Sequence, residues 1–502
     1  MQDTQPAPPA RPVLRQVIGQ RTAVSVVFIT SMFVTILDTT IVNVALASMT
    51  RSFDTSAAAM SSVSVAYLVA LAVVIPTSGW LGDRFGTKQT LLVALALFTL
   101  ASVLCGLAQN LPELVAFRVL QGVGGGILTP IGMTMLFHVY PPKDRIRAAR
   151  VLTVPTTLAP ALGPVLGGLL VDGPGWRWVF FVNIPVGLFA IAFGLLFVAR
   201  IEGPRSIGRL DLPGVVLSAG GFAGVMYAVS AGATQGWSSP SVVVAAVAGA
   251  VLVAGLVVWQ LRSTRPLLDL RLFGNRLFRT INIASLLYSV SFLGTLFVFP
   301  LMLQEAFGRS AIAAGLNTFP EAVGVMSGAW LVGRIYAAIG PRRLMASGML
   351  GVAVTAGLLA TVRADTAPWL VWLVMFVLGV AMAHLFVPAQ TAAFATVAPG
   401  RTGSASALYN AQRQFGMALG VAVMGSVLAA VGTTRLTPDG PRPDLTAYHT
   451  AFLVAAGIAL AGAVAALLVP DKEAAVTMTR DTKAPARQKN EDRPDPLPDG
   501  SH

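Results

Sequence analysis

Long apolar runs constrain this chain more than any other feature of its sequence. A helix that crosses a hydrocarbon core about 30 Å thick needs roughly 20 apolar residues, because each residue advances it by about 1.5 Å. Runs of this length, separated by polar or charged loops, cover 22–48, 57–80, 89–109, 112–138, 148–171, 179–200, 212–232, 240–262, 278–303, 310–336, 341–362, 367–392, 403–432 and 448–470. We therefore expect an all-α integral membrane protein with fourteen transmembrane helices.

The composition and the distribution of charge also indicate a membrane protein. Of the 502 residues, 55% are hydrophobic and 11% are charged, whereas soluble domains carry about 25% charged residues. In a soluble protein the net charge of +13 would suggest nucleic acid, but most of the 35 Lys and Arg residues fall in alternate loops. The positive-inside rule places those loops in the cytoplasm. We expect a multi-pass protein of the plasma membrane, with both termini cytoplasmic and no nucleic-acid partner.

A weak internal repeat indicates two similar halves. The segment from Gly79 to Lys88 is echoed by residues 328–334 and 340–343, and weak repetition of this kind is typical of transporter folds. The tail is polar and Pro-rich, so it cannot bury a core. The predicted organisation is a cytoplasmic segment (1–21), a six-helix half (22–200), two inserted helices with flanking loops (201–277), a second six-helix half (278–470) and a disordered cytoplasmic tail (471–502).

Asp38 lies inside the first apolar run, where a charge costs roughly 2.5–3.5 kcal/mol on insertion scales. It lies about 24 Å from the cytoplasmic start of its run, and Arg118 lies about 9 Å from the outer start of the fourth run. A core about 30 Å thick brings these depths together, so we expect the two side chains to meet. Either they form a permanent structural ion pair, or Asp38 alternates between Arg118, a proton and a cationic substrate. Thr39 and Asn43, one turn apart, are expected to share this polar face.

The loop after the second run reads GWLGDRFGTK. Gly79 and Gly86 allow a tight turn, and Asp83 and Arg84 are placed to pair or to cap helix ends. Lys88 completes the pattern. The plainer interpretation is a turn flanked by ordinary cytoplasmic charges.

The fifth run contains a second glycine pattern, GPVLGG. Gly163 and Gly167 form a small-xxx-small pair that lets a neighbouring backbone approach closely, and Gly168 extends it. Pro164 removes a helix donor and permits a kink. Simple helix packing is the alternative interpretation.

Together, these motifs resemble those of the fourteen-span drug/proton antiporter group of the major facilitator superfamily. Further matches are LDTTIVNVAL in the first run, WRWVFFVNIPVG at 176–187, PLLDLRLF at 266–273 and SASALYNAQRQFG at 404–416. The resemblance covers about residues 20–470. It implies a two-half helical bundle, a conformational latch at Gly79–Lys88, an antiporter-motif helix around Gly163–Gly168, and a cavity lined by the ninth run.

Three ionisable residues lie in the runs of the second half. Glu321 departs from the pattern of the family, and a carboxylate near the bilayer midplane favours either a second proton or cation site or a buried pair. His384 is interpreted as a satisfied core residue rather than a proton relay. Arg413 is expected to be structural, with Glu321 as a possible partner. The possible cavity-lining residues are Thr39, Asn43, Tyr288, Phe292, His384, Asn410 and Arg413.

Tyr288, Phe292 and Phe299 recur at helical spacing in the ninth run. Aromatic faces there would hold a flat or cationic drug by stacking and cation–π contact. The alternative, which we weigh slightly more heavily from sequence alone, is that these rings face lipid.

The sequence lacks the patterns of an ATP-driven pump or an enzyme. There is no GxxxxGK[ST] motif, no His/Cys cluster and no Ser/His/Asp constellation. We expect a proton-driven antiporter without cofactors, working as a monomer in the lipid bilayer, with coupling by Asp38, Arg118 and Glu321. Its expected small-molecule substrates are lipophilic, often cationic drugs or dyes. The alternatives are an exporter dedicated to an endogenous metabolite, lipid or self-made antibiotic, and a non-transporting membrane sensor.

Overall fold

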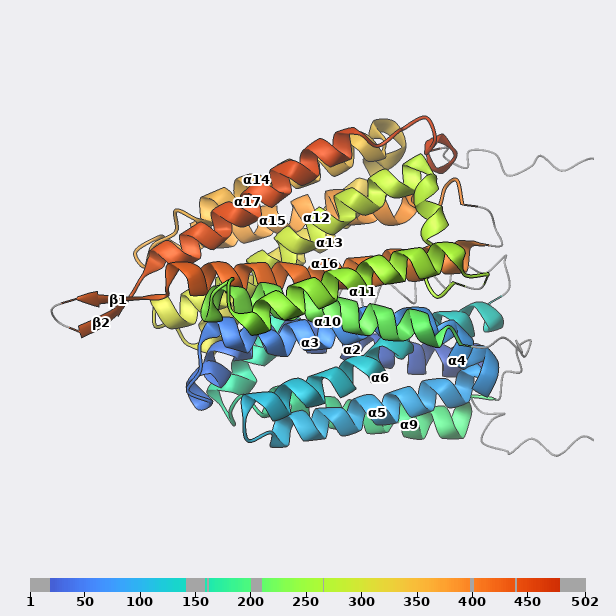
Figure 1. The fold of residues 1–502 in the computed structure, drawn as a ribbon, viewed down its shortest axis with the longest axis horizontal. Coiled ribbons are helices and arrows are strands. Elements are labelled where there is room, and N and C mark those ends of the chain that lie inside the picture. The colour runs from blue at the N-terminus through green and yellow to red at the C-terminus, as the bar shows by residue number, and fades with distance from the viewer. Residues whose placement is uncertain are drawn as a thin grey trace, which may run out of the picture.

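The computed structural model describes residues 19–140, 159, 162–199, 210–264, 266–397, 401–437 and 440–478. The chain is a bundle of helices that run back and forth between two ends (Figure 1). We call one end the hairpin end, because it carries the antiparallel strands β1 (Thr434–Thr437) and β2 (Gly440–Pro443). We call the other the basic end. There α4 (Ser78–Phe85) meets α5 (Thr87–Leu107), and α13 (Ala311–Ile339) meets α14 (Pro341–Leu359), with Arg84, Lys88 and Arg342 in the helix turns next to these junctions.

The helices of the first half follow the predicted runs closely. They are α2 (Gln20–Ser52), α3 (Ala57–Val74), η1 (Ile75–Thr77), α4 (Ser78–Phe85), α5 (Thr87–Leu107), α6 (Leu111–Val139), an apolar helix over Leu162–Asp172, α8 (Trp178–Phe181) and α9 (Asn183–Phe197).

The inserted pair and the second half follow. They comprise α10 (Leu212–Gln235), α11 (Pro240–Arg262), η3 (Leu270–Gly274), α12 (Arg276–Leu301), η4 (Met302–Ala306), α13 (Ala311–Ile339), α14 (Pro341–Leu359), α15 (Pro368–Ala392), α16 (Thr402–Val431), α17 (Leu445–Leu467) and η6 (Ala475–Thr477).

Twelve helices in the described part of the chain are long and apolar enough to cross a membrane. The predicted span at 341–362 corresponds to α14, whose first turn carries two arginines and which packs against α15 and α17. The helix Leu162–Asp172 is the described part of the predicted span at 148–171, most of whose first half lies outside the described residues. The all-α membrane fold expected from the sequence is confirmed.

Each half packs mainly within itself. In the first half, α6 packs against α3 and α5, while in the second, α13 packs on α15 and α14 on α17. The main contact between the halves joins α3 to α16. α10 lies over this seam and packs against both helices. Towards α16, the hydroxyl of Ser426 donates to the carbonyl of Val229, and the ring centroids of Phe222 and Phe415 lie 4.5 Å apart.

Proline and glycine set the breaks at the basic end. Pro76 has no N–H to donate, and at this point the chain leaves α3 for one turn of 3₁₀ helix. Gly86 then separates α4 from α5 with a φ of 86°, and Gly340 separates α13 from α14 with a φ of 83°. Residues other than glycine are strained at such positive φ values. The same backbone conformation therefore explains why both loops have a glycine at this point.

The prediction that the chain is disordered from residue 471 is wrong for 471–478. Asp471 accepts a hydrogen bond from the backbone N–H of Arg342 at 2.9 Å, at the start of α14. Met478 packs on the cluster of Val332, Tyr336 and Leu344. Composition predicted disorder because a polar tail has no core of its own, but these residues use apolar surface supplied by α13 and α14. The remainder of the predicted tail lies outside the described residues.

Candidate functional site

The structure places Asp38 and Arg118 in contact, as their matched depths predicted. Nη1 of Arg118 lies 2.5 Å from Oδ2 of Asp38, and the exposed fractions of the two side chains are 1% and 0%. Asp38 comes from the middle of α2, and Arg118 from the second turn of α6. A pair this deep is retained only with complementary partners, because each ion gives up its hydration.

Two amides complete the surroundings of Asp38. Its Oδ1 accepts hydrogen bonds from Nε2 of Gln121 at 2.9 Å and from Nδ2 of Asn183 at 3.0 Å. Gln121 also accepts from Arg118 at 2.7 Å and donates to the hydroxyl of Ser102 at 2.8 Å. Sequence reasoning did not select these amides as site residues. The spacing of three residues between Arg118 and Gln121 was a usable signal, because it puts both on one helix face.

Arg118 is held on its remaining sides. Its Nε donates to the carbonyl of Val63 at 3.3 Å, and its guanidinium carbon lies 4.0 Å from the ring centroid of Tyr67. The hydroxyl of Tyr67 reaches the carbonyl of Thr35 at 3.4 Å. Thr35 lies one turn before Asp38 on α2, so this chain of contacts returns to the helix that carries the carboxylate.

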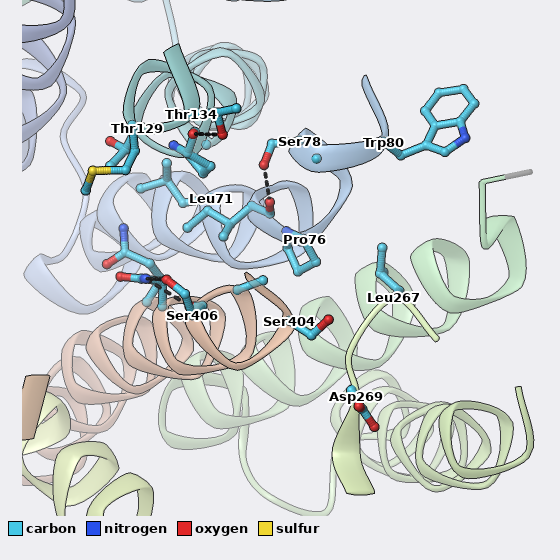
Figure 2. Close-up of a pocket in the computed structure, with 18 of the residues that line it drawn as sticks. Leu71, Pro76, Ser78, Trp80, Thr129, Thr134, Leu267, Asp269, Ser404 and Ser406 are labelled. Carbon is cyan, nitrogen blue, oxygen red and sulfur yellow. Dashed lines mark hydrogen bonds between the residues drawn. The ribbon is translucent and has the colours of Figure 1, made fainter. Parts of the chain in front are cut away.

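A cavity of about 1080 Å³ lies between the halves and reaches the basic end. Figure 2 shows its walls: Leu71 and Pro76 face Ser404 and Ser406 of α16, with Thr129 of α6 on a third side. Hydroxyl and apolar groups alternate around the space. Asp38 is not among the lining residues, but Thr35 is.

At the hairpin end the two halves are in contact. The carboxylate of Asp172 accepts hydrogen bonds from the backbone N–H groups of Ala311 and Ile312, at 3.1 and 2.7 Å, and so caps α13. Nε2 of Gln304 donates to the carbonyl of Val44 at 2.9 Å. The cavity is therefore bounded on this side by contacts between the halves.

The glycines of the fifth run allow a close approach, as predicted from their spacing. A Cβ atom at Gly163 or Gly167 would crowd Thr40 or Ile41 of α2, and one at Gly168 would meet the backbone of Ile312 on α13. Pro164 lies in the same contact, because its carbonyl faces Gly315 of α13. The helix Leu162–Asp172 thus packs tightly against α2 of its own half and against α13 of the other half, near the hairpin end.

Of the seven predicted cavity-lining residues, Asn410 and Arg413 line this cavity. The Thr39 hydroxyl bonds to the carbonyl of Thr35 within its own helix, and Asn43 is buried. Neither lies in the cavity wall.

The aromatic residues of α12 do not face lipid. Tyr288 and Phe292 are buried, with exposed fractions of 3% and 7%, and their rings stack with centroids 5.6 Å apart and planes 4° apart. Phe299 is fully buried. The lipid-facing interpretation is therefore wrong, because α12 lies inside the bundle, packed against α16 and α17.

Glu321 and Arg413 are both present in the interior of the second half but do not form an ion pair. Glu321 has an exposed fraction of 4%, and among the described residues no ion pair or hydrogen bond of its side chain is found. Arg413 likewise has none there, and its Nε is buried without a partner. The possible pairing of Arg413 with Glu321 is not present in this conformation, and the structural role expected for Arg413 stays a prediction.

His384 has an ordinary structural contact. Nδ1 of its ring lies 2.8 Å from the carbonyl of Val380, one turn earlier on α15. Its Cβ lies against Gly348 of α14. This arrangement agrees with the interpretation of a satisfied residue in the packed interior.

The loop motif at the basic end ties helix termini together. Nζ of Lys88 donates to the carbonyls of Leu195 and Val198, at 3.2 and 2.6 Å, where α9 ends. Asp83 and Arg84 are exposed and form no ion pair with each other, and Gly79 lines the cavity. In the second half, the carboxylate of Asp471 accepts a hydrogen bond from the backbone N–H of Arg342 at the start of α14. Both halves thus have a side chain that bonds to the backbone at the end of another helix.

Two helical halves that enclose a cavity, joined at one end and separated by that cavity towards the other, define a membrane carrier for solutes. The comparison with protein families agrees: the model of the Major Facilitator Superfamily matches residues 28–421 and, in a second match, 281–494. The chain belongs to the major facilitator superfamily and is a membrane transporter of that class.

Similar proteins cover most of the chain. It is 31% identical over 476 residues to the multidrug resistance protein B homolog of Mycobacterium tuberculosis, covering 87% of this chain and 88% of that protein. It is 34% identical over 440 residues to the putative multidrug resistance protein MdtD of Cronobacter sakazakii, covering 88% and 93%. A crystal structure of a POT family transporter in complex with a thioalcohol-conjugated peptide has the same fold, with a TM-score of 0.65, 14% identity and coverage of 90% and 98%.

Proposed function

We propose that this transporter exports lipophilic, often cationic drugs or dyes in exchange for protons, by alternating access. The basic end faces the cytoplasm and the chain works as a monomer in the plasma membrane. Support comes from relatives that are named multidrug resistance proteins. Their similarity to this chain covers 88% and 93% of their own length. It also comes from a cavity whose walls mix apolar surface with hydroxyl groups, which suits molecules of varied shape.

The observation that carries the proposal is the enclosed pair of Asp38 and Arg118. A membrane-buried carboxylate and guanidinium mark ion pathways more often than they serve stability. Protonation of Asp38 would remove the countercharge of Arg118, which then has to find new partners. Arg118 contacts Tyr67, whose hydroxyl bonds to Thr35 in the cavity wall. A proton on Asp38 and a substrate in the cavity would therefore act on the same segment of α2 without touching each other.

The cycle uses contacts already described. From the state with the cavity at the cytoplasmic side, the halves rock so that the contacts of Asp172 with α13 and of Gln304 with α2 open. The links of Lys88 and Asp471 keep helix termini together within each half while the halves move. Protons entering from outside neutralise Asp38, with Glu321 as the second site, and the proton gradient supplies the energy. One charge crossing 100 mV is worth about 2.3 kcal/mol.

The proposal is tested with purified protein in acid-loaded vesicles, where protons leave as dye enters. We expect a lipophilic monocationic dye to accumulate, and a pH indicator in the lumen to report proton loss that depends on added dye. Accumulation without proton loss would contradict the antiport. Neither movement, over a panel of cationic and neutral dyes, would favour an exporter dedicated to a single endogenous compound.

A further inference from the structure

We infer that Arg413 is a recognition residue for the carboxylate of an amphiphilic substrate, at the inner end of the cavity. The inference concerns binding and builds on the proposed function only in supposing that what binds there is then transported. It extends the predicted substrates from lipophilic cations to lipophilic molecules that carry an acid group, including zwitterions.

Position is the first support. Arg413 lies twelve residues after Arg401 on α16, and at about 1.5 Å per residue this places it roughly 18 Å further from the basic end. It lines the cavity together with Asn410 and Gln414, and all three come from α16, the helix that also carries Ser406. A ligand that enters from the basic end meets Arg401 at the mouth and Arg413 at depth.

Charge compensation is the second support. Arg401 lies 3.2 Å from the carboxylate of Asp269. Asp211, also in the cavity wall, accepts hydrogen bonds from Trp259 and Gln260 and from the backbone N–H groups of Gly214 and Leu267. Both groups therefore have partners within the protein: Arg401 has a countercharge, and Asp211 accepts several hydrogen bonds.

Arg413 differs from them. Within the described chain it makes no ion pair and no hydrogen bond, and Nε is buried without an acceptor. The ring of Phe386 is nearby, with its centroid 5.5 Å from the guanidinium carbon of Arg413. Arg413 is half-buried, and its Nε is a donor that has lost water without gaining an acceptor, which is costly. This position is explained if an acceptor arrives with the ligand.

The chemistry of Arg413 favours an anionic acceptor with paired oxygens, and we take it to be a carboxylate. A guanidinium presents paired N–H donors in a fixed fork that matches the two oxygens of a carboxylate. A cation placed here would be repelled by Arg413, and a neutral apolar group would leave its donors unpaired. The remaining wall, with Leu71, Ile75 and Met133 beside hydroxyl groups, suits the apolar body of an amphiphile.

Glu321 is the internal candidate that this inference has to exclude. Glu321 on α13 and Arg413 on α16 belong to the same half, but the two charged groups are not within ion-pair distance of each other. If Arg413 served only to neutralise Glu321 in another conformation, its loss would affect all substrates alike.

The test compares a rhodamine dye that has a free carboxylate with its ethyl ester, which has the same ring system. Binding of each is measured by fluorescence anisotropy on the purified full chain in lipid nanodiscs. We expect Arg413→Gln to weaken binding of the carboxylate dye about tenfold or more and to leave the ester within about twofold, as expected for loss of a charge-assisted hydrogen bond. Arg413→Lys, which keeps the charge but not the fork, should give an intermediate loss for the carboxylate dye alone.

The matched control is Arg401→Gln combined with Asp269→Asn. It removes an already compensated pair of charges from the same cavity and leaves no unpaired charge behind, so the ratio of the two dissociation constants should stay as in the wild type. If Arg413→Gln does not yield folded protein, Arg413→Lys carries the test.

Equal loss of both dyes in the Arg413 variants overturns the inference. If Glu321→Gln combined with Arg413→Gln then restores both, Arg413 is the partner of Glu321 instead. Because binding is measured without a gradient, these outcomes do not depend on proton coupling. Proton-coupled uptake of the ester in vesicles separately reports whether the proposed antiport holds.

Discussion

The two halves of this transporter hold their buried charges in different ways. In the first half, Asp38 and Arg118 satisfy each other, and Gln121 and Asn183 fill the remaining sites of the carboxylate. In the second half, Glu321 and Arg413 are buried or half-buried without either kind of partner among the described residues. In the closed network of the first half, the charged groups find their partners within the fold. In the open group of the second half, the charged side chains lack partners that a bound ligand would have to supply.

We expect this difference to divide the work of transport between the halves. A substitution in the closed network strands another buried group and so costs stability. A substitution in the open group strands nothing, so its effect should appear in the choice of substrate rather than in folding. The following substitutions test this division, beginning with the largest expected effect.

Asp38→Asn should break the closed network most severely. It leaves the guanidinium of Arg118 buried without a countercharge, which costs roughly 3–5 kcal/mol when one member of a buried pair is removed. We expect a lower thermal unfolding temperature in detergent and loss of proton-coupled dye uptake in vesicles. Replacing both Asp38 and Arg118 with apolar residues should recover much of the stability but no transport. Wild-type coupled uptake in Asp38→Asn would remove Asp38 from the mechanism.

Gln121→Leu should have a smaller effect of the same kind. The ion pair remains, but Asp38 and Ser102 each lose one donor and Arg118 loses one acceptor, which costs about 1–3 kcal/mol for groups left unsatisfied. Thermal unfolding should shift down less than in Asp38→Asn. Uptake should fall but stay coupled to protons. An unfolding temperature equal to that of the wild type would show that the network is not closed.

Glu321→Gln should leave stability within about 1 kcal/mol of the wild type, because no partner loses a contact. Its effect should fall on substrates: uptake of a dicationic dye should drop about tenfold more than that of a monocationic one, since a second positive charge needs a second carboxylate. Uptake assays with both dyes measure this directly. Equal losses would mean that Glu321 does not read substrate charge.

His384→Gln should have the smallest effect. The His384 ring bonds to a carbonyl of its own helix, and an amide can replace that contact if the ring nitrogen is the donor. We expect uptake within about twofold of the wild type at every pH tested. A shifted pH profile would place His384 among the groups that carry protons and would add it to the open half.

Much of the fold could be predicted from the sequence because a bilayer dictates it. Apolar length gave the spans, and the helix rise gave matching depths for Asp38 and Arg118. The enclosure of that pair was not predictable, since Asn183 reaches Asp38 from a helix 145 residues away in sequence. Hydropathy alone also could not tell whether Phe292 faces lipid or the interior, because both surroundings are apolar. Whether Arg413 has a partner depends on every helix packed around it, so a local sequence pattern cannot predict it.

The inserted helix α10 has a mechanical consequence for this transporter. It packs on α3 of one half and on α16 of the other, and its contacts with α16 include Phe222 with Phe415 and Val229 with Ser426. Under the proposed rocking of the halves, α10 cannot keep a fixed position relative to both, so at least one of its two surfaces has to slide. The packing of α10 against α3 or α16 would therefore have to change in every transport cycle.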